Sequence, residues 1–333
     1  MLTYILKRLT QFIPLWFLIT VVVFVLIQLP PGDYLTNMIS NLESQGTQVS
    51  QAYIDNLTQR YHLREPMVSQ YFYWLGGVLF RGDLGTSFVW QKPVAEVISD
   101  RMALTIALSL LSLLVSWAIA IPVGIYSAIK QYSIFDYVSM FIAFLGASVP
   151  GFIMALFLVY QFFNATGIAI TGLFSSTYVS ASWSFAKFLD LMKHVWLPVV
   201  IIAVNSTGAM MRTVRGLMLD ELGKEYVLTA RAKGLTEPRL MIKYPVRLAF
   251  NPIISTIGWL LPSIIGGEVL VSVILNLQTM GPLMLRSLLN QDMYLAASFL
   301  LITSTLTLFG TLVSDILLVT LDPRIRFSRI GMS

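Results

Sequence analysis

The sequence predicts an all-α integral membrane protein with six transmembrane helices. Apolar residues make up 56% of the 333 residues and charged residues only 12%, whereas soluble domains are usually about one quarter charged. The apolar residues gather in runs of about 20, the length that a helix needs to cross the hydrocarbon core of a bilayer. The chain contains no cysteine, which excludes a disulfide framework, thiol catalysis and cysteine metal sites.

The first span is expected at the end of segment 1–29, directly after Lys7 and Arg8. A secretory signal peptide is the alternative, but a turn-forming Pro-Pro-Gly-Asp sequence follows in place of a small-residue cleavage site. Residues 30–101 then form a long extracytoplasmic region. Within it, an amphipathic helix is predicted at 49–63, and the aromatic segment 71–80 is too short to span and suits the outer interface.

The second span is predicted at 103–126 and the third at 137–163. Pro150 and Gly151 stand in the middle of the third span, where a proline removes a backbone donor and breaks the helical ladder. The carbonyl groups that lose their partners need new ones inside a membrane. Such a kink either lines a pathway for solute or only shapes packing, so Pro150 and Gly151 are candidate pathway residues.

A second outer loop is predicted at 164–193, and the fourth span follows at 195–211. The fifth span begins near residue 251, where an Asn-Pro pair suits the start of a helix. The sixth span covers 294–320 and completes a core of five helices at 102–320. A cytoplasmic tail is expected at 321–333.

Pro262 and the pair Gly266-Gly267 interrupt the fifth span, and Gly266, Gly267 and the adjacent Glu268 are candidate gate or pathway residues. An intramembrane carboxylate is costly and often functional. However, Glu268 lies about 25 Å along the span at 1.5 Å per residue, which is close to the outer interface. It is therefore either a gate or pathway group or a structural carboxylate that is solvated or paired.

A charged segment at 211–247 separates the fourth and fifth spans, with eight Lys/Arg against four Asp/Glu. Within it, Tyr226, Val227, Ala230 and Gly234 recur at helical spacing, which predicts a short helix. Gly234 suits the end of that helix, and a threonine followed by proline at 236–238 suits the start of a second one. Because Ala230 and Gly234 are small, their face is expected to be bare enough for another protein to approach closely.

The distribution of positive charge sets the orientation of the chain. With both termini inside, fourteen Lys/Arg fall on the cytoplasmic side and eight outside, in agreement with the positive-inside rule. The net charge of +5 therefore reflects membrane topology, and no nucleic-acid partner is expected.

The sequence TARAKGL at 229–235 resembles the cytoplasmic "EAA" loop of permease subunits of ATP-binding-cassette (ABC) importers, in the dipeptide/oligopeptide (peptide/nickel) branch. The LPPGD and RGDLGTSF segments and the final Leu-Asp-Pro-Arg-Ile-Arg at 321–326 resemble the same branch. The resemblance covers nearly the whole chain. The chain departs from the general form of that loop, of which only Ala230 and Gly234 match outright.

The resemblance implies a type I importer fold in which the loop at 212–250 carries a coupling helix that docks on an ATPase subunit. The expected coupling residues are Glu225, Tyr226, Thr229, Ala230, Arg231, Ala232, Lys233 and Gly234. It also implies a second homologous permease chain (more often a different chain than a copy), two ABC ATPase subunits and an extracytoplasmic solute-binding protein. All would assemble at a bacterial inner membrane.

No GxxxxGK[ST] phosphate-binding motif occurs in the sequence, so ATP and Mg are expected in the ATPase partners and no cofactor or metal in this chain. A secondary transporter of small solutes is the main alternative, and would need inverted repeats or several intramembrane charges. A membrane-embedded enzyme would need clustered His, Asp or Glu. The sequence leaves the solute open among peptides, oligosaccharides and nickel chelates.

Overall fold

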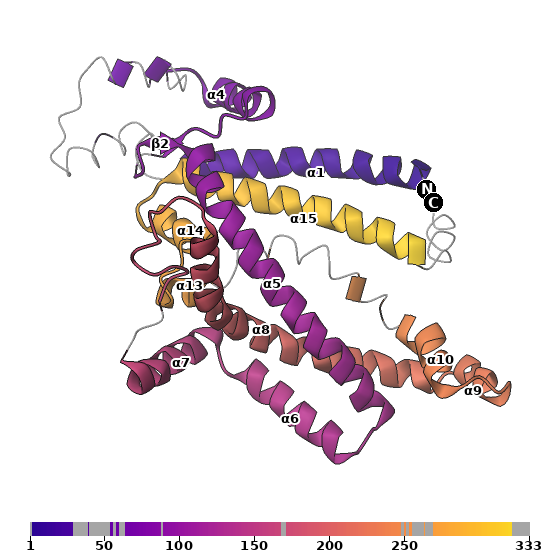
Figure 1. The fold of residues 1–333 in the computed structure, drawn as a ribbon. Coiled ribbons are helices and arrows are strands. Elements are labelled where there is room, and N and C mark those ends of the chain that lie inside the picture. Colours follow the sequence, from indigo (N-terminus) through magenta and orange to yellow (C-terminus); the bar gives the residue numbers. More distant parts are fainter. Residues whose placement is uncertain are drawn as a thin grey trace. The chain divides into compact units, whose positions relative to one another are not determined.

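The computed structural model describes residues 2–28, 39, 54–55, 58–59, 64–87, 89–167, 171–247, 250, 253–254, 263 and 269–321. These residues form helices and one short pair of strands (Figure 1). The chain divides into two compact units. The first comprises Met1–Ala103 and Leu283–Phe309, and the second comprises Leu104–Pro282 and Gly310–Ser333.

Helix α1 (Leu2–Gln28) lies beside the first part of α15 (Met293–Leu321) in the first unit (Figure 1). The indole Nε1 of Trp16 donates a hydrogen bond to the hydroxyl of Thr305, at 3.0 Å. Many other side chains of α1 are apolar and exposed, such as Leu18 at 60%. This composition suits a helix that contacts lipid on its outer face.

Aromatic rings join α1 to α4 (Met67–Gly76), the helix formed by the aromatic segment of the outer region. The ring of Phe24 packs edge-on against Tyr71 at 5.5 Å and tilted against Trp74 at 5.6 Å. The Tyr71 hydroxyl also shares a hydrogen bond of 2.8 Å with Thr20. The segment is too short to span a membrane, as the sequence predicts; the structure adds that it is helical and that its polar atoms meet partners on α1.

A π-helical turn η1 (Gly77–Arg81) and two short antiparallel strands, β1 (Thr86–Ser87) and β2 (Lys92–Pro93), follow α4. The carboxylate of Asp292, which is fully buried, accepts hydrogen bonds from the Ser87 hydroxyl and from a backbone N–H of the same loop. Burial raises the pKa of Asp292 above its usual value. This carboxylate ties the loop after η1 to the start of α15.

The second unit contains the two longest helices among the described residues, and three of its helices pack in close contact. Its helices include α5 (Val94–Ile129), which begins in the first unit, α6 (Ile134–Ser148), α7 (Gly151–Thr166), α8 (Phe185–Leu222), α13 (Val269–Ile274) and the start of α14 (Met280–Leu289).

Glycines allow α8 to approach α5 and α6 closely. A Cβ placed on Gly208 of α8 would overlap the backbone carbonyl of Ala143 on α6, and one on Gly124 of α5 would lie 2.9 Å from Val214 on α8. Backbones in such contact gain dispersion attraction, which drives helix association in a membrane where both lipid and side chains are apolar. The interface between α6 and α8 therefore depends on the absence of a side chain at Gly208.

A cluster of buried apolar side chains joins α7, α8 and α13. Ala155, Leu197, Ile201, Val271 and Leu275 are each 1% exposed or less and pack together. The cluster holds α7 against the N-terminal half of α8.

Helices α6 and α7 meet at a bend of 97° around Pro150 (Figure 1). Val149 is extended (φ −87°, ψ 118°), as the residue before a proline prefers, and Gly151 begins the next helix. The sequence predicts a kink within one span, whereas the structure has two helices nearly at right angles.

Among the described residues, four helices are long and apolar enough to cross a membrane, and α6 with α7 makes five if the bent pair is one span. The expected first, second, fourth and sixth spans correspond to α1, α5, α8 and α15. Most of the expected fifth span, and much of the amphipathic helix expected at 49–63, lie outside the described residues. Helices α5 and α8 are longer than the spans expected at 103–126 and 195–211, because the helical hydrogen bonding continues into the polar residues on either side of each apolar run.

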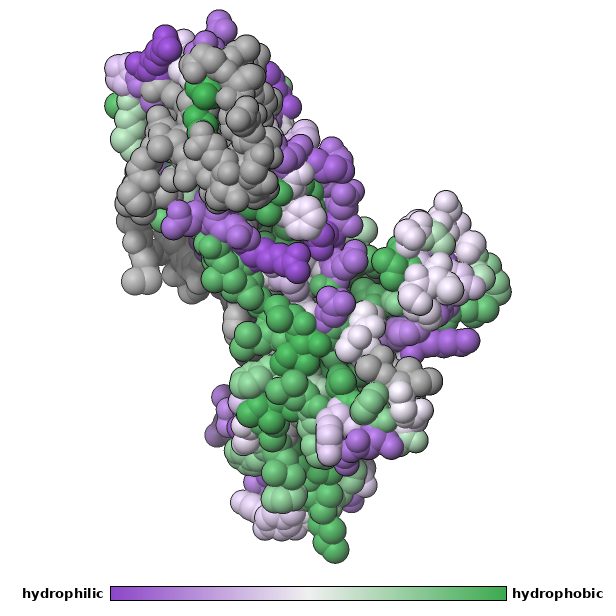
Figure 2. Space-filling model, turned by 90° about the vertical axis from the view of Figure 1, so that its left-hand side faces the viewer, coloured by the Kyte–Doolittle hydropathy of each residue, from purple (hydrophilic) through white to green (hydrophobic). Residues whose placement is uncertain are grey.

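Exposed apolar side chains cover a broad area on one face of the molecule (Figure 2). On α6 and α7, Phe141, Phe144, Phe157 and Tyr160 are all more than half exposed. Apolar surface of this extent is unfavourable in water. The chain is therefore an all-helical, multi-pass membrane protein.

The glycine contact between α6 and α8 leads to a first prediction. Gly208→Ala should destabilise the protein by about 1–3 kcal/mol, because the new methyl group overlaps a backbone carbonyl that cannot easily move. Gly216 lies on the same helix with open space around it, so Gly216→Ala should be neutral or stabilising by up to about 1 kcal/mol. Thermal unfolding of the two variants in detergent measures the difference, and equal unfolding temperatures would contradict the packing described.

Candidate functional site

The charged segment folds into a compact pair of helices at the end of α8 (Figure 1). After α8 ends at Leu222, the chain forms α9 (Glu225–Ala232), α10 (Glu237–Met241) and the π-helical turn η2 (Ile242–Val246). We call residues 225–246 the α9–α10 segment. Its two helices agree with the pair predicted from the sequence.

Gly234 makes the turn between the two helices. Its φ of +79° lies in the left-handed region that glycine adopts without strain. The turn is closed by a backbone hydrogen bond from the Leu235 N–H to the Ala230 carbonyl, at 3.3 Å. Across it, the guanidinium of Arg231 donates to both carboxylate oxygens of Glu237, at 2.6 and 3.2 Å, and lowers the pKa of this exposed carboxyl.

The inner face of the α9–α10 segment is buried within the chain itself. Val227 and Leu240 are fully buried and Ala230 is 5% exposed. They pack against Met218 and Val214 of α8, which are also buried. The segment is thereby fixed to the end of α8 by apolar contacts, so that a displacement of one displaces the other.

The position of Ala230 corrects an expectation from the sequence. The spacing correctly places Ala230 on one face with Tyr226 and Val227, but that face packs on α8 and is not available to another protein. Gly234 is exposed, with no atom near its Cβ position. Ala230 and Gly234 therefore do not form a bare docking face together.

The outer face of the segment is exposed, polar and basic. Two large apolar side chains are exceptions that were not predicted from the sequence: Leu228 on α9, at 53% exposure, and Ile242 at the start of η2, at 71%. The sequence does contain a signal for the exposure of Leu228, because Leu228 does not share the helical spacing that places Val227 and Ala230 on one face. The exposed expected residues are Glu225, Thr229, Arg231, Ala232, Lys233 and Gly234.

Tyr226 lies at the junction between the segment and α8. Its side chain is half-buried, and its hydroxyl donates a hydrogen bond to the carboxylate of Glu221 near the end of α8. Burial and this hydrogen bond raise the pKa of the Tyr226 phenol. Tyr226 therefore joins α9 to the end of α8.

An ion pair fixes α8 to the turn between α5 and α6. The guanidinium of Arg215 donates to both carboxylate oxygens of Asp136, at 2.6 and 2.7 Å, and Asp136 is 2% exposed. The hydroxyl of Ser127 and the backbone N–H of Tyr132 also donate to this carboxylate. A buried charge is tolerated when it is paired and hydrogen-bonded in this way. This pair was not predicted from the sequence; the spacing of Ser133 and Asp136 indicates only the start of α6, where the Ser133 hydroxyl accepts a hydrogen bond from the Asp136 backbone N–H.

The other candidate residues do not form one site among the described residues. Pro150 is exposed at the bend between α6 and α7, and Gly151 is buried beside it. Gly266, Gly267 and Glu268 lie outside the described residues. No group of His, Asp or Glu suited to hold a metal ion occurs in the part of the chain that the structure describes.

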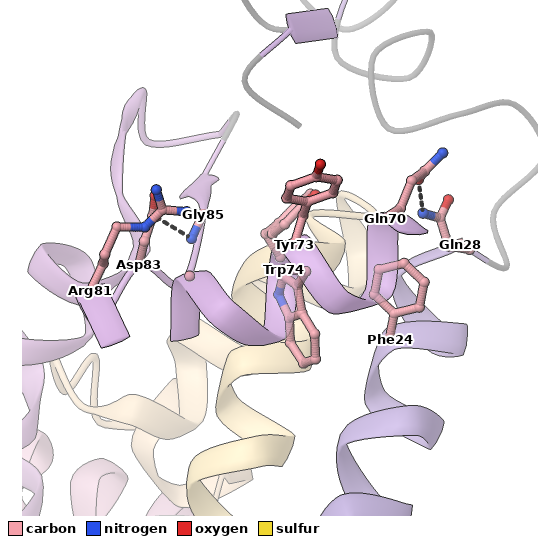
Figure 3. Close-up of a pocket in the computed structure, with 10 residues that line it drawn as sticks. Phe24, Gln28, Gln70, Tyr73, Trp74, Arg81, Asp83 and Gly85 are labelled. Atoms are coloured by element: carbon pink, nitrogen blue, oxygen red, sulfur yellow. Dashed lines mark hydrogen bonds between the residues drawn. The ribbon is translucent and has the colours of Figure 1, made fainter. Parts of the chain in front are cut away.

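A pocket in the first unit lies between α1, α4 and the loop after η1 (Figure 3). Phe24, Tyr73 and Trp74 supply its apolar wall, and the amides of Gln28 and Gln70 are joined by a hydrogen bond of 3.0 Å. A volume of about 50 Å³ holds a few water molecules. The pocket is too small for a peptide.

Comparison with known proteins places two family models on this chain. The model described as "binding-protein-dependent transport system inner membrane component" matches residues 120–327. The model of the N-terminal part of such a membrane component matches residues 1–109.

Relatives match over their full length. The oligopeptide transport system permease protein AppB of Bacillus subtilis is 34% identical over 328 residues, which cover 98% of this chain and 100% of that protein. The dipeptide transport system permease protein DppB of Escherichia coli is 29% identical, covering 99% and 100%. The oligopeptide transport system permease protein OppB of Haemophilus influenzae is 29% identical, covering 98% and 100%.

The two faces of α9 lead to a second prediction. Ala230→Arg should destabilise the α9–α10 segment by about 3 kcal/mol or more, because it places an unpaired charge in an apolar cluster. Ala232→Arg, two residues away on the exposed face, should change stability by less than about 0.5 kcal/mol. Amide hydrogen exchange of residues 225–246 distinguishes the two. Equal protection in both variants would show that Ala230 does not face α8.

Proposed function

This chain belongs to the family of binding-protein-dependent transport system inner membrane components, and from that premise we propose that it carries peptides across a bacterial cytoplasmic membrane. It is a permease subunit of an ABC importer and not a secondary transporter. The names of its relatives supply the solute class, since they are oligopeptide and dipeptide permeases. The match over the whole of each relative is the observation that carries this proposal.

ATP hydrolysis belongs to separate ATPase subunits in this proposal, because the sequence has no GxxxxGK[ST] motif. ATP and Mg then bind to two such subunits. A second, homologous permease chain completes the membrane part; it is a different chain, so that the two form a heterodimer. An extracytoplasmic solute-binding protein delivers the peptide. The dependence of the family on a binding protein supports the last of these partners.

The outer face of the α9–α10 segment is the proposed coupling surface. Leu228 supplies an exposed apolar side chain and Lys233 an exposed positive charge, while the nearby Arg231 is paired with Glu237. The inner face joins this surface to α8, and the pair between Asp136 and Arg215 joins α8 to the turn between α5 and α6. A movement of a docked ATPase would then be transmitted to α8 and, through the ion pair, to α5 and α6.

The proposed topology has six spans with both termini in the cytoplasm, in a type I importer fold with a cytoplasmic coupling helix. It adds the span expected after residue 251 to the five that α1, α5, α6 with α7, α8 and α15 supply. Pro150, Gly151, Gly266, Gly267 and Glu268 remain candidates for the solute pathway. The bend at Pro150 supports a pathway role there, because it ends one helix and starts another within a single membrane segment.

A third prediction tests the coupling surface. Gly234→Trp should weaken ATPase binding by about 2 kcal/mol, or roughly thirtyfold, because a bulky side chain separates two surfaces that must approach closely. Gly234→Ala is the matched control: it imposes the same left-handed strain, about 1 kcal/mol or more, without the bulk. Retention of the ATPase on purification and ATP-driven peptide uptake in vesicles with all subunits measure the effect. Wild-type uptake by Gly234→Trp would remove the segment from coupling.

A fourth prediction tests the orientation, and the absence of cysteine provides a clean background. Ser180 and Ala232 are both exposed. A cysteine at Ser180 should react with an impermeant thiol reagent added to intact spheroplasts, and one at Ala232 should react only after permeabilisation. The reverse pattern would overturn both the orientation and the coupling surface.

A further inference from the structure

A cavity of about 220 Å³ opens beside the N-terminus of α8. It lies wholly within the second unit, between the loop that precedes α8, the start of α8 and the turn that follows α13. A cavity of about 150 Å³ accommodates a benzene ring. The space here is therefore sufficient for one amino-acid residue.

The ammonium group of Lys187 lines this cavity and is only partly satisfied. Lys187 is 6% exposed, and its Nζ donates one hydrogen bond of 2.5 Å to the carbonyl of Ala181. The rings of Phe174 and Trp183 lie 4.9 and 5.4 Å from the same nitrogen. Among the described residues, no carboxylate forms an ion pair with it. Since an ammonium has three donors, two remain for a group in the cavity.

The carboxylate nearest in sequence is already engaged elsewhere. Asp190 lies three residues further along α8 and accepts hydrogen bonds from the backbone N–H and hydroxyl of Ser175, at 2.7 and 2.5 Å. His194 adds a contact of 3.8 Å. Asp190 thus fastens the loop to α8 and leaves Lys187 without an anionic partner, its contacts being one carbonyl and two aromatic rings. A buried cation of this kind is unfavourable unless an anion joins it.

Other features of the cavity also favour an anion with an attached apolar group. The first turn of α8 adds the positive end of a 38-residue helix, with the hydroxyl of Ser184 capping the N–H of Lys187. The rings of Phe174 and Trp183 form an apolar wall. On the other side, Asn276 and Gln278 are exposed residues whose side-chain amides can donate and accept hydrogen bonds.

We propose that this cavity binds the C-terminal residue of a peptide on its way into the transporter. The α-carboxylate of the peptide pairs with Lys187, its last side chain lies against Phe174 and Trp183, and its last peptide group reaches Asn276 and Gln278. The inference rests on the proposed function for its solute class, and on the outer location of the loop that precedes α8 for its place in the cycle.

The test uses the assembled complex of both permease chains and the ATPases in nanodiscs, without the binding protein. The probe is a dipeptide that ends in p-benzoylphenylalanine, either as the free acid or as its C-terminal amide. After irradiation, mass spectrometry locates the label. The free acid should label residues 171–187 or 276–278 about tenfold more than the amide, the factor expected when one charge-assisted hydrogen bond is lost.

Variants assign the effect to one ammonium group. Lys187→Gln should lower labelling by the free acid about tenfold and remove the preference for acid over amide. Lys193→Gln is the matched control, since Lys193 is exposed on the same helix and should leave labelling unchanged. Lys187→Arg keeps the charge and should retain the preference. If Lys187→Gln does not assemble, the acid-to-amide comparison in the wild type and in Lys187→Arg decides.

Three results would overturn the proposal: equal labelling by acid and amide, label outside the cavity, or full labelling in Lys187→Gln. ATP-driven uptake of the same dipeptide with the binding protein present is measured separately. Absent uptake together with acid-selective labelling would contradict the proposed function and not the carboxylate site. Normal uptake without acid-selective labelling would contradict the carboxylate site alone.

Discussion

The buried ion pair between Asp136 and Arg215 determines where α8 leaves the helical core, and the α9–α10 segment depends on that position. The carboxylate receives four hydrogen bonds, two from Arg215 and one each from Ser127 and the backbone of Tyr132. Met211 and Met218 lie about one helical turn before and after Arg215, and both are buried against other elements. Loss of the carboxylate would leave a partly buried guanidinium without its partner, which is strongly unfavourable. The pair therefore sets the register between α8 and the turn that joins α5 to α6.

Hydropathy was sufficient to predict four of the expected spans in their order, as α1, α5, α8 and α15, but it did not predict the helix ends. Helix α8 continues eleven residues past Met211 because Val214 and Met218 still face a core, even though the charged Arg215 stands between them. Helical spacing likewise grouped Val227 with Ala230 correctly. It could not tell whether the face they share is covered by this chain or by a partner, because an apolar stripe has the same sequence pattern in both cases.

Contacts between distant residues were beyond the reach of the sequence. Asp136 and Arg215 are 79 positions apart, and no spacing rule joins them. The same holds for the burial of Lys187. The sequence places it in the outer loop expected at 164–193, where the positive-inside rule counts it only as an outer charge, whereas the structure places it in the first turn of α8. A proline in a span predicts a break in hydrogen bonding, whereas the 97° between α6 and α7 depends on what each helix packs against.

The central claim is that the outer face of α9 contacts the ATPase, and a site-directed crosslink tests it most directly. A benzophenone maleimide would be attached to a single cysteine at Leu228, or to one at Phe141, an exposed apolar residue of α6, in the assembled complex. The account predicts a crosslink to the ATPase from position 228 and none from position 141. A crosslink to the ATPase from position 141, or none from position 228, would contradict it.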